Sequence, residues 1–216
     1  MDPRDDAPRT TPKKNPYAHC PRLPEGETVD LRSLVSGDEI ELEIGCGRGV
    51  FVFERAAAAP SVGLVGLEVR RKWATIVDER VAKQGLSSRC RVFAEDAKIA
   101  MPRLRPDAGV ARVFMHFPDP WWKKRHEKRL VMGDVFMNEV VRLLRPMGEL
   151  YIQTDVEDRA ESYAQQISAH GGFEPFGDAD GSPWLAENPY GARSPREHRA
   201  IKDGLPVYRM RFRKKG

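Results

Sequence analysis

The sequence has few cysteines and no paired cysteine motif. Its three cysteines, Cys20, Cys46 and Cys90, lie far apart in a chain of 216 residues and form no C-x-x-C element. This spacing provides neither a structural zinc site nor a disulfide framework, and it favours a reducing, cytoplasmic compartment. His116 and His126 have no matching ligand at metal spacing, so we expect no metal site.

Long apolar runs are also missing. No apolar run approaches the roughly 18 residues of a membrane-spanning helix, so we expect no membrane segment. Residues 1–16 are polar and proline-rich and lack the apolar core of a secretory signal. With 40% hydrophobic and 31% charged residues, the composition is that of an ordinary soluble domain. The net charge of +4 is only a mild indication of a polyanionic partner.

Proline content changes near residue 38. Residues 1–37 hold six prolines in their first 24 positions and few large apolar residues. We therefore expect this segment to be a disordered or loosely attached arm. Residues 38–216 form the predicted globular domain, and their length is enough for one substantial core.

Within this domain, short apolar segments alternate with helical ones. Strands are predicted in EIELEIG, VGLVGLEV, RCRVFAED, VARVFMHF and ELYIQTD. The alternation predicts an α/β fold with a mostly parallel twisted sheet and helices on both faces. PVYRMRFR predicts a late antiparallel edge strand. Residues 178–205 have little periodicity and are typical of a long functional or disordered loop.

A glycine-rich segment, LEIGCGRG, follows the first of these strands. Gly45, Gly47 and Gly49 stand where the strand passes into a helix, and glycines there let the backbone approach a ligand closely. The pattern is E-x-G-x-G, not the G-x-G-x-x-G of dinucleotide sites. Glu43 would repel a pyrophosphate but suits a cation. S-adenosylmethionine fits, because it carries a sulfonium and an ammonium and no phosphate.

Further carboxylates follow the later strands. Glu68 closes the second strand, where an acid can bind a ribose hydroxyl pair, and Asp96 closes the third, where it can meet an adenine edge. Asp119 follows the fourth strand between two prolines, which fix the backbone on both sides. Because ligands bind outside the carboxyl ends of parallel strands, these acids should line one crevice. The alternative, that Glu43 and Glu68 are ordinary strand-end carboxylates, stays open.

A basic segment follows Asp119 directly. Trp121 and Trp122 come first, and each is suited either to stacking on a base or to core packing. The charged side chains after them are Lys123, Lys124, Arg125, Lys128 and Arg129, with His126 among them. A solvated surface is the usual reading of such a run, but its place beside the predicted crevice favours binding to nucleic-acid phosphates.

These motifs together resemble one known family. LEIGCGRG, GLEVRRK, AEDA, FPDPWWKKRHEKRL and QTDVED are similar to segments of bacterial tRNA (guanine-N7-)-methyltransferases of the TrmB type, from about Asp38 to the C-terminus. FPDPW-x-KKRH-x-KR is the most specific element. The resemblance implies a Rossmann-like class I methyltransferase domain with S-adenosylmethionine as its cofactor. It also implies methyl transfer to N7 of a guanosine in the tRNA variable loop, at tRNA position 46.

The resemblance further implies roles for individual residues. Glu43, Glu68, Asp96 and Asp119 match cofactor-contacting positions, and Asp119 also matches the catalytic one. The matches to substrate-binding positions are Lys123, Asp155, Ser194 and Glu197, and residues 125–130 match an RNA-contacting segment.

The sequence departs from the family pattern at three positions. The family usually has Thr where Ser194 stands, an aromatic residue where Arg196 stands, and Trp where Val156 stands. Ser194 keeps a hydroxyl for hydrogen bonding. The two missing rings change what is available for stacking on a base.

Three other functions remain to be weighed. The first is an NAD-linked oxidoreductase, against which the glycine spacing and Glu43 count. The second is a non-catalytic RNA-binding module, against which the complete set of strand-end acids counts. The third is an S-adenosylmethionine-dependent methyltransferase that acts on another RNA or on a non-RNA substrate. We expect tRNA as the partner and see no sign of an obligatory protein partner.

Overall fold

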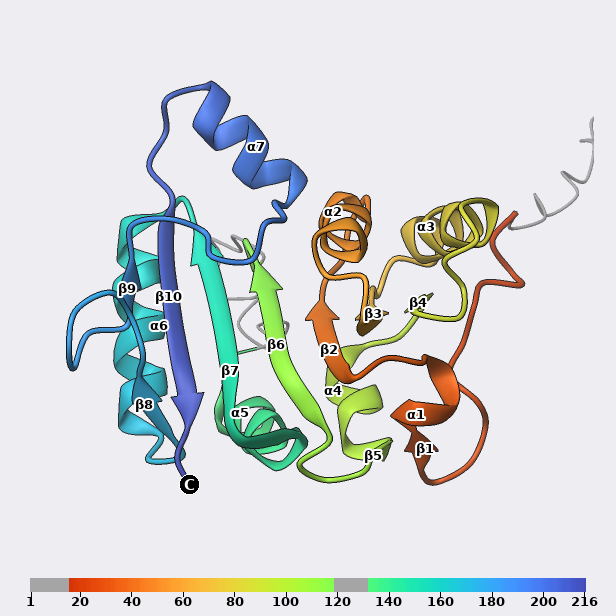
Figure 1. Cartoon of the computed structure of the whole chain (residues 1–216), viewed down its shortest axis with the longest axis horizontal. Helices are drawn as coiled ribbons and strands as arrows, with labels where there is room; N and C mark the ends of the chain where they lie inside the picture. Colours follow the sequence, from red (N-terminus) through yellow and green to blue (C-terminus); the bar gives the residue numbers. More distant parts are fainter. Residues whose placement is uncertain (1–15, 119–131) are drawn as a thin grey trace, which may run out of the picture.

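The computed structural model describes residues 16–118 and 132–216, and an eight-stranded β-sheet forms its centre (Figure 1). The strand order is β4-β3-β2-β6-β7-β10-β8, and β9 pairs with β10. The parallel strands are β2 (Glu39–Ile44), β3 (Val62–Leu67), β4 (Cys90–Phe93), β6 (Val110–His116) and β7 (Leu144–Thr154). These are the five strands expected from the apolar segments, so the predicted α/β fold with a mostly parallel sheet is confirmed.

Helices cover both faces of the sheet. They are α2 (Val50–Ala58), α3 (Arg71–Lys83), α4 (Ala97–Ala100), the 3-10 helix η1 (Met101–Arg103), α5 (Asp134–Leu143) and α6 (Glu157–Ala169). Val52 of α2 and Val77 of α3 share one core cluster with β3 and β4. Phe136 of α5 and Ile167 of α6 belong to a second cluster on the opposite face. Among the described helices, none is long and apolar enough to cross a membrane.

The face of β2, β6 and β7 opposite the second cluster is unusually polar. Alternate residues of a strand share a face, which places Glu41 and Glu43 on the same side of β2. Arg112 and His116 of β6 and Gln153 of β7 occupy the same face. Glu41, Glu43, His116 and Gln153 are buried, and Arg112 is half-buried. The segments that cover this face must therefore supply hydrogen-bond partners as well as apolar contacts.

Part of the predicted flexible arm is folded. It contains β1 (Val29–Asp30), which pairs in parallel with β5 (Leu104–Arg105), and α1 (Leu31–Leu34). Leu23 and Leu31 are buried in the core cluster of α5 and α6. The expectation of a loose arm over residues 1–37 is therefore wrong for this part of it. Apolar side chains within and after the proline-rich stretch pack into the core. Residues 1–15 lie outside the described residues.

The last strand, β10 (Tyr208–Lys214), runs antiparallel to β7, as expected. The prediction that it forms the edge of the sheet is wrong. β8 (Phe173–Pro175) and β9 (Trp184–Leu185) pair with its other side. These strands are three and two residues long, too short to show an alternating pattern in the sequence. The segment expected as a long loop also contains a helix, α7 (Pro195–Lys202).

The buried position of Leu31 gives a first prediction. Replacing Leu31 with Ala should lower the free energy of unfolding by about 2–5 kcal/mol, because the variant loses apolar burial and leaves a cavity. The matched control is Arg32→Ala on the exposed side of the same turn, which should change the value by less than about 0.5 kcal/mol. Urea unfolding followed by circular dichroism measures both. Equal unfolding midpoints would show that this segment contributes nothing to the core.

Candidate active site

The carboxyl ends of the parallel strands meet at one edge of the sheet, at the top of Figure 1, which we call the carboxyl edge. Glu43 lies near the end of β2, Glu68 directly follows β3, and Asp155 directly follows β7. Asp96 stands between β4 and α4. In open α/β sheets, ligands bind in the crevice outside these strand ends. The fold thus brings the described candidate acids to one edge, as the sequence predicts.

The glycine loop joins β2 to α2 at this edge. Gly45, Gly47 and Gly49 have φ angles of 81°, 51° and 72°, which favour glycine. A Cβ atom on Gly49 would lie 2.4 Å from Val77 Cγ1, so this glycine allows α2 and α3 to pack closely. A Cβ on Gly45 would meet nothing within 4 Å, and on Gly47 only Arg70 Nη2 at 3.9 Å. The first two glycines therefore border open space, as the approach of a ligand to the backbone requires.

The carboxylate of Glu68 holds this loop in place. Its Oε2 atom accepts a hydrogen bond of 2.8 Å from the Gly47 N–H, and Oε1 accepts one of 2.9 Å from the Arg70 N–H. Arg70 Nε also donates to Oε1 at 3.1 Å. Oε2 keeps one lone pair for a further donor, such as a ribose hydroxyl. Glu68 thus orders the glycine loop, and its contact with a cofactor stays a prediction.

Glu43 is almost completely buried, and only one of its carboxylate oxygens is bonded. Its Oε1 atom lies 3.0 Å from Nδ1 of His116 on the neighbouring strand. Oε2 has no hydrogen-bond partner among the described residues. Leaving a buried charged oxygen without a partner is unfavourable. A ligand with a cationic donor, such as the ammonium of S-adenosylmethionine, fits this oxygen.

The thiol of Cys46, within the glycine loop, is not a reactive group. Burial, together with the negative charges of Glu43 and Glu68, raises the pKa of Cys46 well above its usual range. The thiol donates weakly to the Glu43 carbonyl oxygen at 3.6 Å. Because a nucleophilic cysteine needs the thiolate form, Cys46 has a packing role here.

Asp96 is exposed and begins α4. Its Oδ1 atom accepts a hydrogen bond of 2.9 Å from the Lys98 N–H, the usual arrangement of a helix N-cap. The carboxylate stays accessible from the carboxyl edge, where an adenine edge would lie. This contact also stays a prediction.

Asp155 is held by an arginine that the sequence pattern did not connect with it. Arg196 of α7 donates from Nε to Asp155 Oδ2 at 2.8 Å, and its Nη2 atom donates to the same oxygen. The Asp155 side chain is 14% exposed. The arginine that stands where the family usually has an aromatic residue therefore orients a candidate substrate-binding carboxylate. The opposite charges of the two residues were the only signal of this pair in the sequence.

The other two candidates on α7 have their contacts inside the protein. Ser194 caps the helix, because its Oγ atom accepts from the Glu197 N–H at 3.2 Å. Glu197 has no exposed surface. Its carboxylate accepts hydrogen bonds from Arg209 Nη2 at 3.0 Å, Gln153 Nε2 at 3.0 Å and Asn188 Nδ2 at 3.0 Å. These contacts fix α7 against β7 and β10, while direct binding of substrate by Ser194 or Glu197 stays a prediction.

Comparison with known proteins assigns the family. A family model described as "Putative methyltransferase" matches residues 38–210. The chain is 39% identical, over 82% of its length, to the tRNA (guanine-N(7)-)-methyltransferase of Anaeromyxobacter dehalogenans, of which it covers 86%. It is 34% identical, over 80% of its length, to that of Thermosynechococcus vestitus, of which it covers 79%. The chain belongs to the tRNA (guanine-N7-)-methyltransferase family.

A solved structure agrees with this assignment at the level of the fold. The 16S rRNA methyltransferase KamB superposes on this methyltransferase with a TM-score of 0.60, covering 86% of this chain and 91% of that one. The identity between the two is 17%. Such a likeness shows the class I methyltransferase fold and leaves the substrate open, because one fold supports many activities.

In the sequence, the basic segment of the methyltransferase follows β6, which ends at the carboxyl edge. The last described residues before it include Phe117, whose N–H donates to the Gln153 carbonyl at 2.8 Å. The candidates of this segment are Asp119, Lys123, Lys124, Arg125, His126, Lys128 and Arg129, and all of them lie outside the described residues, as do Trp121 and Trp122. Their roles stay predictions from the sequence.

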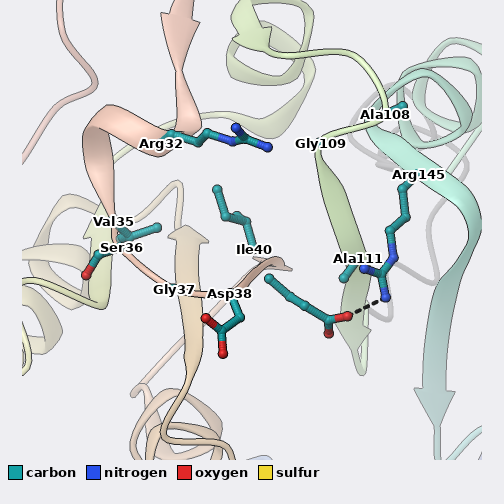
Figure 2. Close-up of a pocket in the computed structure, with 11 residues that line it drawn as sticks. Arg32, Val35, Ser36, Gly37, Asp38, Ile40, Ala108, Gly109, Ala111 and Arg145 are labelled. Carbon is teal, nitrogen blue, oxygen red and sulfur yellow. Dashed lines mark hydrogen bonds and ion pairs between the residues drawn. The ribbon is translucent and has the colours of Figure 1, made fainter.

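A cavity of about 510 Å³ lies at the opposite end of the sheet (Figure 2). Arg32, Asp38, Glu39 and Arg145 line it, and Arg145 forms an ion pair with Glu39 across it. None of the predicted site residues that the structure describes lines this cavity. Within residues 16–118 and 132–216, no group of His, Cys, Asp and Glu side chains is arranged to hold a metal ion.

The buried contacts of Glu197 predict a large effect on stability. Glu197→Ala should lower the free energy of unfolding by about 3–5 kcal/mol, because it leaves the buried Arg209 guanidinium without its counter-charge. Chemical denaturation measures the change. The matched control is Glu187→Ala, an exposed acid nearby, with an expected change below about 0.5 kcal/mol. Similar losses in both variants would contradict the structural role of Glu197.

Proposed function

We propose that this methyltransferase transfers the methyl group of S-adenosylmethionine to N7 of the guanosine at position 46, in the variable loop of tRNA. The observation that carries the proposal is the arrangement at the carboxyl edge. There the open glycine loop and the unpaired oxygen of Glu43 stand beside the strand that leads into FPDPWWKKRHEKR. The strand that leads into the proposed RNA-binding segment thus ends at the same edge as the proposed cofactor site.

The described residues have separate tasks in binding the cofactor. Glu43 offers its free carboxylate oxygen to the ammonium, and the loop at Gly45 gives the cofactor room beside the backbone. Glu68 orders that loop and offers its remaining lone pair to the ribose. Asp96 faces the adenine edge. S-adenosylmethionine supplies an electrophilic methyl group on a positively charged sulfur when it is bound.

The reaction needs alignment more than proton transfer. Guanine N7 has a free lone pair and carries no proton, so no general base is required. The protein has to place N7, the methyl carbon and the sulfur in line. Positive charge then moves to the purine ring, and a fixed carboxylate near the ring stabilises that charge. Asp119 and Asp155 are the candidates, since in the sequence they follow β6 and β7, two parallel strands that end at the carboxyl edge.

Asp155 has the means to bind the guanine edge. Both hydrogen bonds from Arg196 go to its Oδ2 atom. Oδ1 remains free to accept hydrogen bonds from the N1–H and N2–H groups of guanine. The basic residues after Asp119 would bind tRNA phosphates while the target base leaves its stack, a step that costs a few kcal/mol.

The site of methylation tests the proposed function directly. Unmodified tRNA is incubated with the protein and S-adenosylmethionine and then treated with aniline, which cleaves at N7-methylguanosine. We expect one cleavage, at position 46, and none in a control tRNA that carries adenosine there. Cleavage at another guanosine would contradict the assigned position. Methylation of protein, with none of tRNA, would favour the alternative of a non-RNA substrate.

The catalytic assignment gives a prediction for Asp119. Asp119→Ala should lower kcat by at least about 100-fold, the loss expected when a group that stabilises transition-state charge is removed. Its dissociation constant for tRNA should change little, because the basic residues remain. The control is Asp180→Ala, an exposed acid far along the chain, with unchanged kcat. Near-normal turnover of the Asp119 variant would exclude the catalytic role.

A further inference from the structure

The pair formed by Glu43 and His116 has a feature that the proposed cofactor contact of Glu43 does not by itself explain. The two side chains lie on neighbouring parallel strands, where Glu43 is opposite Phe114 and His116 follows two residues later on the same face. Each side chain is only 2% exposed, and Nδ1 lies 3.0 Å from Oε1. The pair is therefore held rigidly at the ends of β2 and β6, next to the glycine loop.

Aromatic rings hold the imidazole of His116 in position. The Phe51 ring of α2 lies 4.2 Å from it, and the rings of Phe114 and Tyr151 lie at 5.9 Å, measured between centroids. Such packing fixes the plane of the ring and excludes water. The nearby basic side chain on α2, Arg55, is committed to Glu41 through bonds of 2.8 and 2.7 Å. Glu43 thus has His116 as its partner within the described protein.

Each member of the pair keeps one unpartnered atom. Glu43 Oε2 and His116 Nε2 are two of the three buried side-chain atoms in the described part of the chain that have no hydrogen-bond partner. The third, Nδ1 of His170, belongs to a residue near β8. Buried polar atoms are nearly always bonded in folded proteins. Two such atoms in one pair at the carboxyl edge indicate that a bound molecule supplies a missing hydrogen-bond partner.

The chemistry of the pair defines the kind of molecule. An ionised carboxylate only accepts hydrogen bonds, so the proton between the two residues belongs to Nδ1 of His116. This bond occupies Oε1 and directs Oε2 away from the imidazole. A carboxylate oxygen held in this way suits a primary ammonium, which carries positive charge and three N–H donors. The α-ammonium of S-adenosylmethionine belongs to this class.

We propose that His116 is a positioning residue of the cofactor site, which orients the Glu43 carboxylate toward the cofactor's ammonium. His116 acts through Glu43, and its own Nε2 atom, on the far side of the ring, is buried without a partner among the described residues. The inference rests on the proposed use of S-adenosylmethionine and adds a residue that determines how tightly the amino-acid part of the cofactor is bound.

Calorimetric titration of the full chain with S-adenosylmethionine, without tRNA, tests this role. His116→Phe keeps a ring among Phe51, Phe114 and Tyr151 but removes the hydrogen bond to Glu43. The dissociation constant should rise about tenfold or more, as expected for losing a hydrogen bond to a charged group. His116→Asn retains a short N–H donor and should restore most of the affinity. Glu43→Gln should weaken binding similarly, and adding His116→Phe to it should weaken binding little further.

The control ligand is 5′-methylthioadenosine, which keeps the adenosine and the sulfur but lacks the amino-acid part. Its affinity should be the same for the wild-type chain and His116→Phe. Equal weakening of both ligands would overturn the proposal, because the ring would then act by general packing. Unchanged affinity of His116→Phe for S-adenosylmethionine would overturn it as well. A wild-type chain that binds no S-adenosylmethionine at all would instead refute the proposed function.

Discussion

The carboxylate of Glu197 ties the C-terminal part of the chain to the sheet. Glu197 belongs to α7, and its carboxylate accepts hydrogen bonds from Arg209 on β10, Gln153 on β7 and Asn188 in the segment before the helix. A charge with no exposed surface is stable only when all of these partners are in place, which leaves α7 one position over the carboxyl ends of β6 and β7 (Figure 1). Arg196, the preceding residue, is thereby carried to Asp155.

The buried acids on this face differ in whether the protein satisfies them. Both oxygens of Glu41 are bonded, to Arg55 and Arg112, at distances of 2.7 to 2.9 Å. Glu197 is likewise surrounded by donors. Glu43 lies two residues from Glu41 on the same strand face, yet one of its oxygens has no partner in the described protein. Burial is alike in all three, so the missing partner is what distinguishes Glu43, the proposed cofactor-binding residue, from Glu41 and Glu197, which stabilise the fold.

Local pattern was enough to predict which glycines and acids gather at the carboxyl edge. The glycines and the acids at the strand ends stand next to clear apolar segments, and parallel pairing brings all strand ends to one edge. The pairs His116–Glu43 and Arg196–Asp155 depend on register and on the docking of α7, which no short segment of sequence encodes. The position of β10 inside the sheet was also not predictable from a short segment, because it results from pairing with two very short strands, β8 and β9. The buried Leu23 and Leu31 were missed because Leu23 stands between two prolines and Leu31 lies in a short segment without a long apolar run.

This chain has Arg196 where the family usually has an aromatic residue. In the proposed function, this difference changes how the substrate-binding residues can recognise the target base. A ring at this position would offer a stacking surface but no charge for Asp155. The guanidinium binds Oδ2 and leaves Oδ1 directed to other donors. In the proposed function, a carboxylate oxygen fixed in this way favours guanine, which has an N–H at N1, over adenine, whose N1 is an acceptor and is repelled. Selection for guanine then depends on hydrogen bonds to the N1–H edge of the base. It does not require an aromatic ring at residue 196.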